Sequence, residues 1–165
     1  LPIYPVFIDE RGEFRRIYDS YSDGLTENRE LRVEQVNISV NPKQATLRGM
    51  HFQKSGPPEN KFISVLSGKI YLVVSNAHLV NSNSTIENSY FVLNKDSGST
   101  LFVPSGLATG WISLSENVVI SYIMTSRFQD CQYGGFAFND TFANIEWPHV
   151  PNVISEQDMN WPSLR

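Results

Sequence analysis

Residues 46–53 read TLRGMHFQ, a run with the period-two alternation of a β-strand. The alternation predicts that His51 shares its face with Gly49, which leaves space beside the imidazole, and that Arg48 and Met50 point to the other face. A lone histidine in a strand is more often packed in a core than functional. The role of His51 therefore depends on the residues that accompany it along the chain.

The composition is that of one ordinary globular domain spanning residues 1–165, since 41% of the 165 residues are hydrophobic. A chain of this length buries roughly two thirds of the surface that it exposes when unfolded. The formal net charge is -4 and the basic residues are scattered, which argues against a generic binder of nucleic acid or of anionic membranes. Any phosphate must therefore be bound by a few individually placed cations.

Cysteine content and hydropathy indicate the compartment. Cys131 is the single cysteine, so it forms neither an internal disulfide nor a thiolate metal cluster. No apolar run approaches the ~20 residues of a membrane span, and the first residues lack the charged-then-apolar pattern of a signal peptide. We expect a cytoplasmic protein that does not associate with membranes.

Short alternating runs separated by glycine and proline predict many short strands and no amphipathic helix. The Ser67–Gly68 link is short enough to predict a hairpin between the strands on either side of it. Residues 19–32 are expected to be loop with at most one helical turn, and residues 75–89 an exposed connection. The expected strands cover residues 6–8, 13–18, 34–40, 46–53, 61–66, 69–74, 90–93, 101–103 and 117–125, and residues 105–111 are expected to form a turn that returns into a further strand.

Two of these strands have faces of different character. In residues 34–40, Val36 and Ile38 share an apolar face with Val40, and we expect that face to pack into the core. The opposite face, with Gln35 and Asn37, then meets either solvent or something polar. In residues 117–125, the most β-rich run, Tyr122 lies on the same face as Ile120 and Met124.

This pattern predicts an all-β fold, a β-sandwich or barrel. The tail from residue 146 onward holds two Trp-Pro pairs, so we expect ordered but irregular structure there. A barrel of this kind commonly holds one small ligand in its mouth.

A catalytic transition metal is not expected in such a barrel. Metal-binding cupins use two close histidines, a carboxylate and a further histidine, whereas this chain has only His51, His78 and His149. The residue two positions after His51 is Gln53. The polar residues must therefore perform acid–base chemistry themselves, or only bind a ligand.

An ordered set of motifs along nearly the whole chain resembles the dTDP-4-dehydrorhamnose 3,5-epimerase family. That resemblance implies a cupin-type jelly-roll barrel with an irregular C-terminal tail, no cofactor, and a nucleotide-diphosphate-linked 4-keto-6-deoxyhexose as substrate. The segments that carry it are DERGEF (residues 9–14), LRGMHFQ (47–53), Lys61, VPSG (103–106), YIMT (122–125), ND (139–140), IEWP (145–148) and SEQD (155–158).

The resemblance assigns four catalytic roles. His51 matches the base of the Arg-Gly-x-His motif, and Asp158 matches the tail aspartate that orients this base. Tyr122 matches the proton donor on the other side of the sugar ring, and Lys61 matches the cation beside the C4 oxygen. These roles fit the chemistry, because a hydrogen beside a ketone is acidic and epimerisation needs a base on one face and an acid on the other.

The resemblance also implies a nucleotide site and a homodimer. Arg11 and Arg48 resemble the family's diphosphate contacts, which suits forked guanidinium donors. Phe14 resembles the aromatic residue that stacks on the base, and Gln35 and Asn37 match amides that line the nucleotide cleft. In the family, the segment that holds Arg11 and Phe14 reaches into the partner's site.

Departures from the family pattern leave alternatives open. Thr109, expected among the substrate-binding residues, stands where the family usually has a second histidine, and Arg16 stands where it tends to have glutamate. An enzyme that inverts only C5 or only C3, or that uses a CDP-sugar, is therefore a real alternative. So are a 3,4-ketoisomerase and a catalytically silent sugar-nucleotide-binding cupin.

Overall fold

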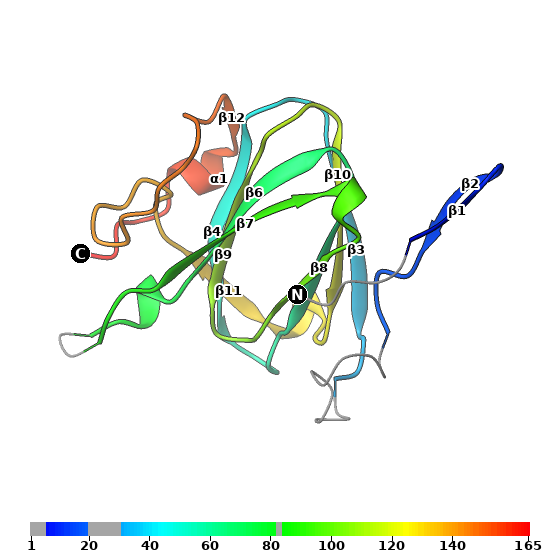
Figure 1. Ribbon diagram of the computed structural model, residues 1–165. Coiled ribbons are helices and arrows are strands. Elements are labelled where there is room, and N and C mark those ends of the chain that lie inside the picture. The colour runs from blue at the N-terminus through cyan, green and yellow to red at the C-terminus, as the bar shows by residue number, and fades with distance from the viewer. Residues whose placement is uncertain (1–5, 20–30, 82–83) are drawn as a thin grey trace.

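The computed structural model describes residues 6–19, 31–81 and 84–165, and in these residues the predicted all-β fold is confirmed. Two sheets face each other and curl into a barrel, as Figure 1 shows. The small sheet has the order β3-β10-β5-β8, and the large sheet has the order β11-β4-β9-β6-β7, with β12 pairing with β4. The expected loop over residues 19–32 lies mostly outside the described residues.

The strands of the small sheet are β3 (Gln35–Asn41), β5 (Lys61–Ser67), β8 (Thr100–Val103) and β10 (Val118–Met124). Those of the large sheet are β4 (Thr46–Ser55), β6 (Lys69–Ser75), β7 (Asn88–Asn94), β9 (Ala108–Ser113), β11 (Gln132–Gly135) and β12 (Val153–Ile154). The described chain also contains three single 3₁₀ turns and one helical turn. The 3₁₀ turns are η1 (Ala77–Leu79), η2 (Lys95–Ser97) and η3 (Phe128–Asp130), and the helical turn is α1 (Glu156–Met159). Most strand predictions are confirmed to within a few residues, whereas β11 and β12 were not predicted.

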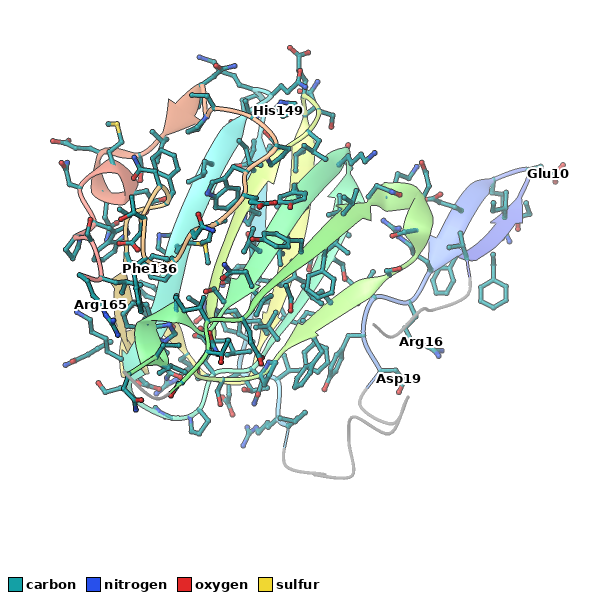
Figure 2. The ribbon with its side chains drawn as sticks, turned by 60° about the vertical axis from the view of Figure 1, so that its left-hand side comes forward. Glu10, Arg16, Asp19, Phe136, His149 and Arg165 are labelled. Atoms are coloured by element: carbon teal, nitrogen blue, oxygen red, sulfur yellow. The ribbon has the colours of Figure 1, made fainter. Side chains whose placement is uncertain are left out.

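A hairpin of β1 (Val6–Asp9) and β2 (Gly12–Arg15) projects away from the barrel. Gly12 turns this hairpin with a φ of 120°, a backbone angle that side-chain-bearing residues rarely adopt. Figure 2 places Glu10 at the tip of the projection, and the apolar side chains of Phe7 and Ile8 are exposed. The C-terminal tail packs on the opposite side of the molecule, where it adds β12 and α1 (Figure 1).

The barrel core lies between the two sheets. It is built from inward-facing aliphatic residues of both, among them Ile63, Ile70, Leu72 and Ile120. The predicted alternation of β10 is confirmed, because Ile120 packs in this core and Tyr122 packs against it from the same face. The described part of the chain contains no helix with the length and hydropathy that crossing a membrane requires.

The hairpin predicted around Ser67–Gly68 is wrong. Strand β5 pairs with β10 and β8, whereas β6 pairs with β7 and β9, so the chain passes from the small sheet to the large sheet at this link. Gly68 makes this corner with a φ of 74° and lies so close to Ser115 that a Cβ atom would be 2.6 Å from its Oγ. A sharp bend between sheets closes the barrel at this end.

The predicted orientation of β3 is also wrong. Val36, Ile38 and Val40 are 59%, 64% and 66% exposed, so this face of β3 does not pack in the barrel core. The opposite face, with Gln35 and Asn37, is partly buried. The sequence pattern has the period of an amphipathic strand, but it cannot say which face of the strand meets the protein interior.

Strand β4 departs from simple alternation at its centre. Its register against β9 shifts between Arg48 and His51, so these two residues, predicted on opposite faces, line the same cavity. Met50 is buried in a separate cluster on the other side of the sheet. A bulge changes the phase of the side chains beyond it, which explains why Arg48 does not share the face of Met50 as predicted, whereas the predicted separation of Met50 from His51 is confirmed.

Candidate active site

A cavity of about 350 Å³ opens between the two sheets. Its size is within the range of clefts that hold small organic ligands. His51, Thr109 and Trp111 come from the large sheet, and Lys61 and Tyr122 come from the small sheet. The cavity wall also includes Asn37, Ile38, Ser39, Arg48, Glu59, Ile63, Met124, Phe128, Tyr133, Gly134, Gln157 and Trp161.

His51 and Asp158 form a hydrogen-bonded pair at one wall of the cavity. The His51 Nε2 atom lies 2.6 Å from Asp158 Oδ1, although 107 residues separate them in the chain. An ionised carboxylate only accepts hydrogen bonds, so the Nε2 atom carries the hydrogen in this pair. In the neutral imidazole this leaves the lone pair, and thus the basic site, on Nδ1.

Asp158 is buried at 4% exposure and has several further donors. The backbone N–H of Gly49 donates to Oδ2 at 3.2 Å, and the Trp161 indole N–H donates to Oδ1 at 3.1 Å. Burial by itself raises the pKa of Asp158, but the contacts with His51, Gly49 and Trp161 outweigh it and hold the pKa below its ordinary value. The carboxylate is therefore charged at neutral pH.

Local structure explains how Asp158 reaches this place. It lies in the turn α1, whose N-cap Ser155 accepts a hydrogen bond from the Asp158 backbone N–H at 3.1 Å. Gly49 can approach the carboxylate because its φ is 129° and its backbone packs on β9, where a Cβ atom would lie 2.5 Å from Gly110 Cα. The glycine therefore serves a close backbone contact, rather than the predicted space beside the imidazole.

Tyr122 lies on the other sheet from His51. Its hydroxyl oxygen accepts a hydrogen bond of 2.7 Å from the Trp111 indole N–H. Burial raises the pKa of Tyr122 to about 12, and the Trp111 bond and the charge of Arg48 oppose that rise only in part. The phenol is therefore protonated at neutral pH, and its own hydrogen is available for donation to another acceptor.

Lys61 is held by a buried carboxylate. Its Nζ atom lies 3.3 Å from Glu59 Oε1, and the two side chains are 14% and 1% exposed. Both residues line the cavity. A lysine in a solvated surface position would be far more exposed, so its ammonium group belongs to the cavity wall.

The structure places four of the predicted binding residues, Arg48, Asn37, Gln35 and Thr109, at the cavity or beside it. Arg48 lines the cavity and is oriented by a 3.1 Å hydrogen bond from its Nε atom to Asn41 Oδ1. Asn37 also lines the cavity, and its Oδ1 atom accepts a 3.0 Å hydrogen bond from Gln35 Nε2. Thr109 stands directly opposite His51 in the β4–β9 pair.

Arg11 and Phe14 are not part of this cavity within the described chain. Both lie on the projecting β1–β2 hairpin, where the Arg11 side chain is 87% exposed and forms an ion pair with Asp9. The Phe14 side chain is likewise exposed. The structure therefore does not bring these two predicted residues to His51.

Several residues that sequence reasoning missed complete the site. Trp111 contacts the predicted acid, Trp161 contacts the carboxylate, and the buried Glu59 accepts a hydrogen bond from the partly buried Tyr133 in the wall. Trp161 lies three residues after Asp158 and beyond the end of α1, so no helical spacing signals their contact in the sequence. In the part of the chain that the structure describes, no group of three or more His, Cys, Asp or Glu residues could hold a metal ion.

Comparisons with known proteins point to one family. The family model described as dTDP-4-dehydrorhamnose 3,5-epimerase matches residues 3–165. The curated protein of that name from Methanothermobacter thermautotrophicus is 31% identical over 166 residues, which cover 97% of this chain and 86% of that protein.

Solved structures give the same result. The dTDP-4-dehydrorhamnose 3,5-epimerase of Elizabethkingia anophelis is 30% identical with a TM-score of 0.77, covering 98% of this chain and 88% of that one. The enzyme of the same name from Bacillus anthracis, solved with TDP and PPi bound, is 27% identical with a TM-score of 0.78. The match covers 98% of this chain and 91% of that one. The predicted cupin-type barrel is thereby confirmed. With the family model and these relatives spanning almost its whole length, the chain belongs to the dTDP-4-dehydrorhamnose 3,5-epimerase family.

Proposed function

We propose that this chain, acting as a single domain over residues 1–165, epimerises a nucleotide-diphosphate-linked 4-keto-deoxyhexose at C5, C3 or both. The observation that carries the proposal is the placement of His51, backed by Asp158, and Tyr122 on opposite sheets around one cavity. Epimerisation beside a ketone requires a base on one face of the sugar and an acid on the other. The names of the relatives support this choice of substrate class.

The proposed reaction begins with proton abstraction by His51. Its Nδ1 lone pair takes the hydrogen from the carbon beside the C4 ketone, and the electron pair of the C–H bond moves into an enolate. Asp158 stabilises the imidazolium that forms and fixes the ring orientation through the 2.6 Å bond to Nε2. The neutral imidazole is regenerated when this proton is lost to solvent.

The enolate is stabilised and then reprotonated by the opposite wall. The Lys61 ammonium group is proposed to lie beside the C4 oxygen, where negative charge develops. Tyr122 donates its hydroxyl hydrogen to the opposite face of the same carbon and recovers a proton from solvent. The bond from Trp111 orients the phenol for this step.

The nucleotide is proposed to bind at the open end of the cavity, with Arg48 on the diphosphate and Gln35 and Asn37 along the cleft. Arg11 and Phe14 are proposed to act in the site of a partner in a homodimer. Two observations support the dimer: the exposed apolar face of β3 and the hairpin that projects away from its own barrel (Figure 1). We place the enzyme in the cytoplasm, where a free thiol such as that of Cys131 remains reduced.

The number of inverted centres depends on Thr109. It pairs with His51 across β4 and β9, in the position where the family resemblance expects a second histidine. A hydroxyl group there carries no positive charge, so one support for a negatively charged intermediate is missing. This observation favours inversion of a single carbon as the second candidate function.

Product analysis by NMR tests the proposal and separates its rivals. The wild-type protein is incubated with dTDP- and CDP-linked 4-keto-6-deoxyglucose, and the product is identified by its coupling constants. Inverted configuration at C3 or C5 with the ketone still at C4 supports the proposal. A ketone at C3 shows a ketoisomerase, and calorimetric binding without any product shows a silent binding protein.

A further inference from the structure

Glu59 is a carboxylate buried in the cavity wall that the proposed reaction does not use. Its side chain is only 1% exposed, and its Oε1 atom lies 3.3 Å from the Lys61 ammonium group. Its Oε2 atom accepts a 3.2 Å hydrogen bond from Ser126 Oγ and a second, short one from the Tyr133 hydroxyl group. Burying a carboxylate is costly unless it is paired and hydrogen-bonded, so this arrangement requires an explanation.

The backbone around Glu59 is fixed from both sides. Its N–H donates a 3.0 Å hydrogen bond to the side-chain oxygen of Gln53, which lies two residues after His51 on β4. The N–H of Asn60 donates to Thr125 Oγ1 at 2.9 Å. Asn60 Oδ1 in turn accepts from the Ser105 N–H at 3.0 Å. The backbone that carries the carboxylate is thus hydrogen-bonded to β4 of the large sheet and to Thr125, the residue that follows β10 of the small sheet.

Tyr133 also holds the Glu59 carboxylate in place. Its ring stacks on Phe128 at a centroid distance of 4.8 Å and an interplanar angle of 12°. Burial raises the pKa of the Tyr133 phenol, and the neighbouring Glu59 raises it further. The phenol therefore stays protonated and donates its hydrogen to the carboxylate, which keeps Oε1 free to face Lys61.

A lysine at this position has a particular need for such a partner. Its ammonium group is a point charge on a flexible four-carbon stem, so it has no built-in orientation. Lys61 makes one ion pair in the described structure, and that is with Glu59. A charge that must lie beside a developing oxyanion contributes most when it is already in place before the reaction.

We propose that Glu59 is a positioning residue, which holds the Lys61 ammonium group at the point of the cavity wall where the enolate oxygen forms. The inference rests on the proposed function. A carboxylate beside the ammonium group also weakens the field of that group at the substrate, and this electrostatic effect lowers kcat, whereas positioning raises it. The sign of the change on removing the Glu59 charge distinguishes the two effects.

A double-mutant cycle in kcat tests the inference. Glu59→Gln keeps the shape of the side chain and removes its charge, and Lys61→Met removes the ammonium group. We expect Glu59→Gln to lower kcat by about tenfold or more with KM within about twofold of the wild type. The double variant should be no slower than Lys61→Met alone, because Glu59 acts through Lys61. Exposed Glu116→Gln is the matched control and keeps wild-type kcat.

Three results would overturn the inference: an unchanged or higher kcat in Glu59→Gln, a change in KM alone, or losses that multiply in the double variant. If Glu59→Gln does not fold, Tyr133→Phe takes its place in the cycle. This variant removes the hydroxyl donor to Glu59 and leaves the ring stacked on Phe128. It should lower kcat in the same direction and lose that effect in the Lys61→Met background.

A substrate-free measurement separates this inference from the proposed function. Mass spectrometry after brief acetic anhydride treatment gives the acylation rate of Lys61 relative to that of exposed Lys43. The relative rate should rise several-fold in Glu59→Gln, because the ion pair no longer holds the amine in the wall. If the wild type converts no sugar nucleotide but Glu59→Gln shows this rise, the proposed function alone is refuted. Equal relative rates in both proteins refute the positioning of Lys61 by Glu59.

Discussion

Trp111 donates a 2.7 Å hydrogen bond from its indole nitrogen to the Tyr122 hydroxyl oxygen, and this bond joins the large sheet to the small sheet across the cavity. It fixes the direction of the phenol, because the oxygen accepts on one side and has its own hydrogen left to donate on another. The proposed acid is therefore oriented by the sheet that carries the proposed base. The predictions below follow from this arrangement and from the His51–Asp158 pair.

Replacing Tyr122 by phenylalanine should separate proton abstraction from inversion. His51 can still remove the hydrogen and return one from solvent to the same face, but the opposite face has lost its donor. In heavy water we therefore expect deuterium in recovered substrate of unchanged configuration, with epimer formation reduced by about a hundredfold or more. NMR of the recovered sugar nucleotide measures both. An epimer formed at the wild-type rate would show that another group is the acid.

The raised pKa of Tyr122 also predicts a stability difference at high pH. The phenol ionises near pH 10 in the unfolded chain and at about 12 in the folded protein. The stability that the raised pKa contributes is present below about pH 10 and is lost as the pH rises toward 12. The free energy of unfolding of the wild type should therefore fall relative to that of Tyr122→Phe, by up to about 1.4 kcal/mol per pH unit in this window.

Urea unfolding of both proteins from about pH 9 to about pH 12 measures this difference. The other tyrosines, among them Tyr71 and Tyr133, titrate in both proteins, so their contribution cancels in the comparison. A gap between the two proteins that stays constant with pH would mean that Tyr122 is not shielded from solvent as the structure indicates.

Replacing Asp158 by asparagine should disable the base without changing its position. An asparagine amide can donate to His51 Nε2 and thereby shift the ring hydrogen to Nδ1, which removes the lone pair that takes the substrate proton. We expect kcat to fall by about a hundredfold or more, with substrate affinity measured by calorimetry changed little. Glu156→Gln, on the same helical turn but exposed, is the control. Retention of more than about half the wild-type kcat would exclude Asp158 from the proposed role.

Mixing two inactive variants should restore activity if Arg11 acts in a partner's site. An Arg11→Ala protein retains His51, and a His51→Ala protein retains Arg11, so a mixed dimer contains one site with both residues. After subunit exchange we expect up to about a quarter of wild-type activity, because mixed dimers are about half of a random population and each has one working site out of two. Sedimentation velocity verifies the dimer. Dimers that mix but remain inactive would place Arg11 outside the neighbouring site.

Local sequence patterns predicted the parts of the fold that depend on one strand at a time. The alternation of residues 117–125 gave the correct inward face, because β10 pairs with β3 in unbroken register and its irregularity against β5 lies before Ile120. The turn at Gly12 was likewise predicted, since positive φ is a property of the residue itself. For these elements, the conformation depends on one strand or one residue, so the local sequence is sufficient to predict it.

Other features depend on the partner of a strand and could not be read from one segment. The bulge that turns Arg48 and His51 to one cavity arises from the register of β4 against β9. The passage from β5 to β6 is a corner because each strand pairs with different neighbours. The apolar face of β3 has the pattern of a core strand although it points outward, since periodicity identifies two faces and not their surroundings.

The site itself was predicted through family resemblance and not through spacing. His51 and Asp158 are 107 residues apart, and no local pattern connects residues at that separation. Glu59 was missed because an acidic residue in a loop near a lysine is usually solvated. Only its burial, with 3% of the whole residue exposed, distinguishes it. Networks of this kind become visible when the side chains are placed in space.

Solvent deuterium uptake by the sugar ring tests the central claim most directly. Wild-type protein and His51→Ala are incubated in heavy water with dTDP-linked 4-keto-6-deoxyglucose, and label at C3 and C5 is measured by NMR and mass spectrometry. The proposed chemistry predicts label at one or both carbons with the wild type and only background with His51→Ala. Label that appears at the same rate in both proteins, or in neither, would contradict His51 as the base of an epimerase.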